Sequence, residues 1–183
     1  PEGTGPNPIW RNLFVLSIGA AAVANGIAAW FHEAYNAEAL AQQLPRAMYY
    51  LGQGHLSPVT LPDPQRAGLP FNYDLLMLFG LVYGPPLPCL NFFNLLAWLA
   101  GGLAVYRLCR LSQLNANASL GAAWFALATT PVLAQAPATT PEVFIGVALL
   151  GAALFFLRWQ RTRRVSDAWL GGLAAGLAAG QWG

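Results

Sequence analysis

Long runs of apolar residues without a charged side chain are the feature that most constrains this fold. The first run, residues 13–31, reads LFVLSIGAAAVANGIAAWF. About 20 mainly apolar residues are enough for a helix to cross a bilayer, where backbone groups must find their partners within the segment or in a closed barrel. Only 9% of the residues are charged, against about a quarter in soluble domains. The sequence therefore predicts an all-α, polytopic membrane bundle.

Five segments have the composition of spanning helices: residues 13–31, 87–106, 118–136, 142–159 and 168–183. The chain begins at Pro1 and stops inside an apolar, glycine-rich run. We therefore expect residues 1–183 to be the N-terminal part of one transmembrane domain, truncated at both ends. In the last segment Gly172, Gly176 and Gly180 have a spacing that lets helices approach closely, and we expect them to serve packing.

The placement of charge predicts how the spans are oriented. The sequence has no lysine, and seven of its nine basic residues border the spans on one side: Arg11, Arg107, Arg110, Arg158, Arg161, Arg163 and Arg164. Such an excess of arginine marks the cytoplasmic side. Five of the seven acidic residues fall on the other side: Glu33, Glu38, Asp63, Asp74 and Glu142. We expect a multi-pass inner (plasma) membrane protein with a cytoplasmic N-terminus and an extracytoplasmic loop at 32–86.

This long loop contains two short helical patterns. In the first, the apolar residues Leu40, Leu44, Ala47, Met48 and Leu51 recur at helical spacing. Pro45 is expected to kink this helix or to open a second one, and Gly52 and Gly54 to end it. The second pattern, at 73–82, is too short to span a bilayer, and Asp74 is expected to cap it. A proline-rich connector joins them, so we expect two interfacial helices roofing a cavity.

The candidate site residues each have a plain structural alternative. Glu142 follows Pro141 at the start of a span, where a carboxylate suits the helix dipole; with Glu38 it would instead face the cavity and bind a metal, a base or a hydroxyl. Arg46 and Arg66 are the only arginines on this side. They suit a phosphate, or they are interfacial and solvated. Tyr49 would line a sugar or lipid groove, or anchor the interface.

Four short motifs occur in a familiar order: LPR with YYLGQG, then PFNYDLLML, TTPE and GGLAAGLAAG. With the long first outer loop, they resemble bacterial members of the GT-C superfamily of membrane glycosyltransferases. The similar enzymes are the protein mannosyltransferase-like and aminoarabinose transferase-like members, of the glycosyltransferase family 39 type. The resemblance covers roughly residues 10 to 180.

The resemblance implies transfer of a sugar from a polyprenyl-phosphate donor on the extracytoplasmic face. Glu38 matches the acidic residue of the first outer loop and would be the general base, and Glu142 matches the second acidic position. Arg46 and Arg66 would contact the leaving phosphate. No cofactor is assigned, and a divalent metal stays open. The chain departs from the pattern at Gln43, where the family has His, at both acids, where it has Asp, and after Gly180, where Lys is absent.

Two other functions stay open: a transporter or permease fragment, and a non-catalytic, divergent membrane subunit. Transporters place ionisable residues near the bilayer midplane. In this sequence the acidic residues gather at one face of the predicted bundle, which favours chemistry at an interface. The partners expected are membrane lipid, the lipid-linked donor and an unidentified acceptor. A nucleic-acid partner is not expected, because no solvated basic stripe is present.

Overall fold

The computed structural model describes residues 7–31, 44–56, 72–83, 90–139 and 141–180, and within them it is helical without strands. The helices are α1 (Pro8–Phe31), α2 (Leu44–Gln53), α3 (Asn72–Val82), α4 (Asn91–Leu111), α5 (Ala116–Ala128), α6 (Thr130–Gln135), α7 (Pro141–Thr162) and α8 (Val165–Ala179). The all-α prediction is confirmed for this part of the chain.

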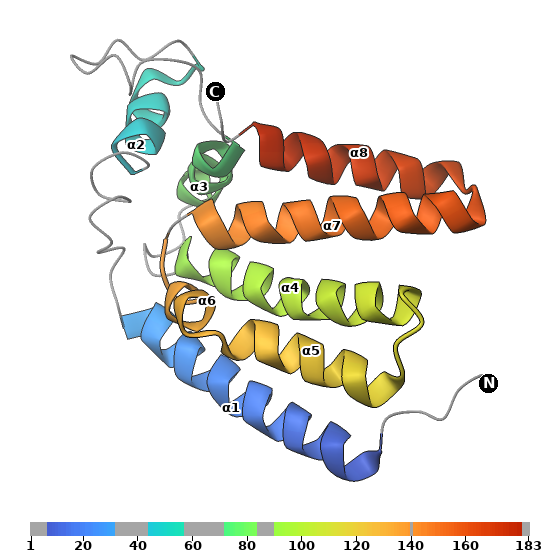
Figure 1. The fold of residues 1–183 in the computed structure, drawn as a ribbon. Helices are drawn as coiled ribbons and strands as arrows, with labels where there is room; N and C mark the ends of the chain where they lie inside the picture. Colours follow the sequence, from blue (N-terminus) through green and yellow to red (C-terminus); the bar gives the residue numbers. More distant parts are fainter. Residues whose placement is uncertain (1–6, 32–43, 57–71, 84–89, 140, 181–183) are drawn as a thin grey trace.

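The long helices lie side by side in the order α8, α7, α4, α5, and α1 packs against α4 and α5 (Figure 1). The short helices α2, α3 and α6 all lie at one end of this bundle, which we call the short-helix end. The opposite end, where α4 leads into α5 and α7 into α8, is called the arginine end. Helices are present at both short helical patterns expected from the sequence, with Pro45 in the first turn of α2 and Gly54 just after its end.

Three helices have the length and apolar character to cross a membrane: α1, α4 and α7, with mean hydropathies of 1.8, 1.4 and 1.8. The other two expected spans differ. Residues 118–136 form two helices, because α5 ends at Thr129, where ψ is 124°, and α6 begins with Pro131 in its first turn. The described part of the last segment, α8, has 15 residues, fewer than a bilayer requires.

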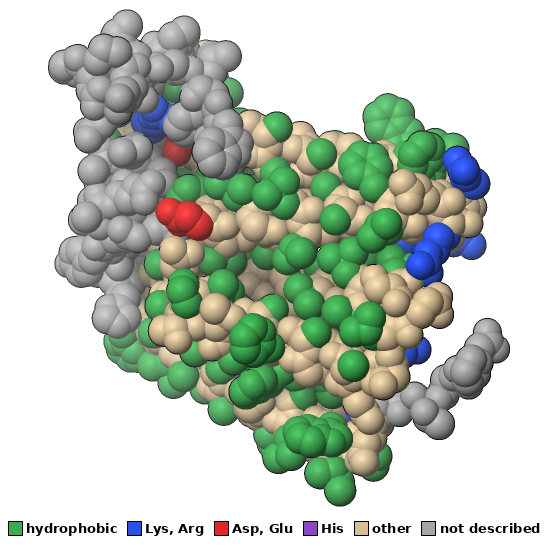
Figure 2. Space-filling view, in the orientation of Figure 1, with side chains coloured by type: hydrophobic (Ala, Val, Ile, Leu, Met, Phe, Trp, Pro, Cys, Tyr) green, Lys and Arg blue, Asp and Glu red, His purple; other side chains and the backbone are tan. Residues whose placement is uncertain are grey.

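The surface of the described chain is apolar along the helices and charged at the ends (Figure 2). On α1, Leu16, Val23 and Ile27 are each more than half exposed, which suits a helix that faces lipid. Arginine side chains gather where α7 turns into α8. The arginines that the sequence groups on one side do lie at one end of the bundle.

Helix α4 is the centre of the bundle because two glycines let its neighbours approach. A Cβ on Gly102 would lie 2.5 Å from a Leu127 methyl of α5, and one on Gly101 would lie 2.9 Å from a Val147 methyl of α7. Trp98, 1% exposed, donates its indole N–H to the Leu127 carbonyl at 3.1 Å. These contacts fix the position of α4, whose first turn enters the candidate site.

The glycines expected to pack α8 do so only in part. A Cβ on Gly172 or Gly176 would meet nothing within 4 Å, so these two residues face open space. Helix α8 packs on α7 through Gly171 against Phe156, and through Ala174 against Gly151. Gly172 and Gly176 therefore lie on the face of α8 away from α7, whereas Gly180 packs closely against the Asn72 side chain of α3.

Candidate functional site

A buried ion pair joins the two short helices at the short-helix end. The Arg46 guanidinium lies 3.4 Å from the Asp74 carboxylate, and the side chains are only 4% and 1% exposed. Asp74 occupies the first turn of α3, where the helix dipole favours a carboxylate. The expectation that Asp74 only caps its helix is thus wrong in part, because this residue also binds Arg46. Arg46, expected at a phosphate, here holds α2 against α3.

The pairing changes which face of α2 is buried. Its buried residues are Arg46, Ala47 and Tyr50, whereas Met48 and Leu51 are 52% and 40% exposed. The predicted apolar stripe is therefore split between two surroundings. Ala47 packs on Tyr73, Met77 and Leu90, and Leu44 packs beside them, while the exposed members face outward. The buried face of α2 is therefore the one that carries Arg46, Ala47 and Tyr50.

Two tyrosines of α2 border the ion pair. Tyr49 is half-buried and meets Tyr50 edge-on, with ring centroids 5.8 Å apart. Tyr50 is 2% exposed. Burial raises the pKa of the Tyr50 phenol above its ordinary value, and the nearby Arg46 charge partly opposes that rise. The phenol is therefore neutral at physiological pH.

The first turn of α4 supplies two buried asparagines that sequence reasoning missed. Asn91 donates to the Ala29 carbonyl at 2.9 Å and accepts from the Thr139 hydroxyl. Asn94 donates to the Ala138 carbonyl at 2.7 Å and accepts from the Tyr73 hydroxyl at 3.4 Å. These bonds tie the end of α1, the segment before α7 and helix α3 to α4. The sequence feature that could have revealed them is the NFFN motif, whose spacing puts both amides on one face of a helix.

Tyr73 links this polar cluster to the start of α7. Its ring lies 5.9 Å from that of Phe144, and the side chain is 1% exposed. Burial raises the pKa of the Tyr73 phenol far above its ordinary value, and the charge of Glu142 raises it further. Tyr73 thus contacts α4 and α7, while its neighbour Asp74 on α3 pairs with Arg46.

Glu142 is exposed in the first turn of α7, beside an apolar pocket of about 180 Å³. The pocket lies among α4, α5, α6 and α7, and side chains such as Trp98, Leu127 and Val143 line it. Gln135 and Glu142 are the polar side chains of its lining. The Glu142 carboxylate therefore stands at the edge of a small apolar pocket.

The structure brings together only part of the predicted site. Arg46, Tyr49 and Glu142 all lie at the short-helix end. Glu38 and Arg66, the expected base and the second phosphate ligand, lie outside the described residues, as does Gln43. Among the residues that the structure describes, no three His, Cys, Asp or Glu side chains cluster in a way that would hold a metal ion.

Comparison with protein-family models, with curated proteins and with solved structures finds no match for this chain. The fold and the hydropathy define the class on their own: a helical protein with three helices long and apolar enough to cross a membrane. At one end of its bundle, short helices enclose a buried polar cluster.

Proposed function

We propose that this chain belongs to an integral membrane glycosyltransferase that uses a polyprenyl-phosphate-linked sugar. The short-helix end would be extracytoplasmic and would hold the reacting groups, and the arginine end would be cytoplasmic. The observation that carries the proposal is the contact of α3 with the polar first turn of α4 and with the start of α7, where Glu142 lines an apolar pocket. A hydrophilic acceptor and a lipid-linked sugar can meet only where a polar site adjoins an apolar one.

The reaction asks little of the protein beyond positioning and one proton transfer. The acceptor oxygen attacks the anomeric carbon of the sugar while its proton passes to a carboxylate, which we assign to Glu38. The bond from the anomeric carbon to the phosphate oxygen breaks, and polyprenyl phosphate leaves with the electron pair. A nearby arginine would stabilise the charge on that phosphate.

Four candidate residues divide the other roles, of which Arg66 lies outside the described residues. Glu142 would accept hydrogen bonds from sugar hydroxyls at the mouth of the pocket, and Tyr49 would line the approach. Arg66 is the assigned phosphate ligand. Arg46 would reach a phosphate only by leaving Asp74, from which it is 3.4 Å away, so its main role is to hold α2 in place.

The test compares two carboxylates of the same loop in the full-length protein. Glu38→Gln should lower transfer from a panel of polyprenyl-phosphate sugars by about 10²- to 10⁴-fold, the usual contribution of a general base. Glu33→Gln, a matched change outside the resembling motif, should leave transfer within a small factor of the unaltered protein. Equal rates in both variants would exclude Glu38 as the base.

A transporter or a non-catalytic subunit is the alternative. The three helices of spanning length carry their charged residues in the first turn or the last two turns, whereas transport sites lie near the midplane. Movement of a labelled solute across vesicles, without consumption of any polyprenyl-phosphate sugar, would favour the transporter.

A further inference from the structure

A second cavity lies at the arginine end, outside the site described above. It is a groove of about 720 Å³ between α4 and α7, within the range of ligand sites. Apolar side chains from both helices, among them Leu103, Leu154 and Phe155, line its length. Three arginines, Arg107, Arg110 and Arg158, belong to the same lining. They stand in the last two turns of their helices, so the groove is apolar along the bundle and cationic at its end.

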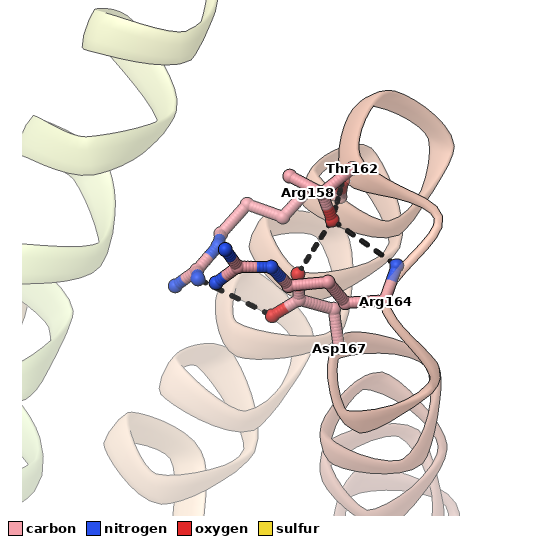
Figure 3. Close-up of polar contacts among 4 residues, drawn as sticks. All are labelled: Arg158, Thr162, Arg164 and Asp167. Carbon is pink, nitrogen blue, oxygen red and sulfur yellow. Dashed lines mark hydrogen bonds and ion pairs between the residues drawn. The ribbon is translucent and has the colours of Figure 1, made fainter.

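One of the three arginines is neutralised and held in place. The Arg158 guanidinium lies 3.3 Å from one oxygen of Asp167, and the other oxygen accepts from the Thr162 hydroxyl at 3.0 Å (Figure 3). The guanidinium carbon also lies 5.8 Å from the centre of the Phe155 ring. Arg158 is thereby fixed at the wall of the groove, with its charge balanced.

The other two arginines leave the groove positive. Arg107 and Arg110 are exposed, and the described contact of Arg110 is a neutral one, from its guanidinium to the Leu114 carbonyl at 3.0 Å. Of the acidic residues that the structure describes, Asp167 alone lies at this end, and it serves Arg158. Two uncompensated cations therefore stand at the end of an apolar groove.

We propose that this groove binds an anionic phospholipid from the membrane leaflet at the arginine end. The lipid phosphate lies at Arg107 and Arg110, whose planar guanidinium groups match phosphate oxygens. One acyl chain lies along Leu103, Leu154 and Phe155. Long arginine side chains near the ends of spanning helices extend to the level of the lipid headgroups, and basic pockets between helices recognise anionic headgroups. A free phosphate ion would leave the apolar walls unused, so the lipid is the better fit.

The proposal needs only that α4 and α7 span the membrane, and it is independent of glycosyl transfer. The test uses the full-length protein in detergent, titrated with phosphatidylglycerol or phosphatidylcholine, with bound lipid counted by native mass spectrometry. The protein should retain more phosphatidylglycerol than phosphatidylcholine. Arg107→Gln with Arg110→Gln should weaken the binding of phosphatidylglycerol by about 30-fold, because each arginine near an anionic headgroup contributes a factor of about five to six in affinity.

The matched control removes two charges at the same end but outside the groove, in Arg161→Gln with Arg163→Gln. Binding in this control should stay within about threefold of the unaltered protein, because charge outside the groove acts only at longer range. Leu103→Trp, at a residue 59% exposed, should fill the groove and weaken binding without lowering the unfolding temperature. Equal loss in both arginine pairs, equal retention of the two lipids, or displacement by inorganic phosphate alone would each overturn the proposal.

Discussion

Arg46 of α2 and Asp74 of α3 form a buried ion pair across 28 residues of sequence. The pair is the polar centre of the contact between the two short helices, which otherwise pack through Ala47 and Met77. Two charges withdrawn from water are stable only together, because each one alone would carry its full desolvation cost. The arrangement of α2 on α3 therefore depends on both residues.

Removing one member of this pair should strongly destabilise the short-helix end. Asp74→Asn leaves the Arg46 charge buried without its counterion, and we expect a loss of about 3–5 kcal/mol. The double variant Arg46→Met with Asp74→Leu should recover most of that loss, because no buried charge remains. Thermal unfolding of the full-length protein in detergent measures both. A single variant as stable as the unaltered protein would show that the pair is open in solution.

The ion pair at the other end should matter less. The Arg158 side chain is 41% exposed, so water screens its attraction to Asp167 and competes for it. Arg158→Gln should cost about 1 kcal/mol or less, in the same unfolding measurement. A loss as large as that of Asp74→Asn would mean that the turn between α7 and α8 depends on this charge.

Alkaline pH should destabilise the fold through Tyr73. Its pKa is raised in the folded protein, so the fold favours the neutral phenol. Below the ordinary tyrosine pKa of about 10, the phenol is neutral in both states and stability does not depend on it. Above that pH the unfolded chain loses the proton first, so stability falls as pH rises. Tyr73→Phe should flatten this fall. An unchanged slope in the variant would contradict the burial of Tyr73.

The amide of Asn94 should stabilise the junction between α4 and the segment before α7. Asn94→Leu removes its 2.7 Å bond to the Ala138 carbonyl and leaves a part-buried acceptor, at a cost of about 1–3 kcal/mol. Asn25→Leu is the matched control. Asn25 donates to the Ala21 carbonyl within α1, an acceptor that the helix itself can serve, so this variant should be nearly neutral. Similar losses in both variants would argue against a special role for Asn94.

Local patterns predicted the elements that depend on local chemistry. Pro45 and Gly54 bracket α2 because one suits a first helical turn and the other, at φ 69°, ends the helix. The grouping of arginines at one end followed from their positions between apolar runs. The break between α5 and α6 at Thr129 was missed, although Pro131 was the available signal, since a proline within an apolar run interrupts its helix.

The site was harder to predict, because its contacts join distant parts of the sequence. Nothing near Arg46 in the sequence indicates that Asp74 neutralises it, and the sequence alone favours a phosphate as the partner of an arginine on that side. Asn91 and Asn94 lie inside an apolar run, where a sequence pattern cannot tell a lipid-facing amide from a buried one. Burial and pairing decide such cases, and both arise only from tertiary packing.

The central claim is that the protein consumes a polyprenyl-phosphate sugar at the short-helix end. The most direct measurement is the release of polyprenyl phosphate by the purified full-length protein in vesicles, with a panel of such donors labelled in the sugar. We expect polyprenyl phosphate to be released only when the protein is present. Release should also require that the donor can reach the membrane side on which α2 and α3 lie. Absence of release from every donor by folded protein, or release that is unchanged in Glu38→Gln, would contradict it.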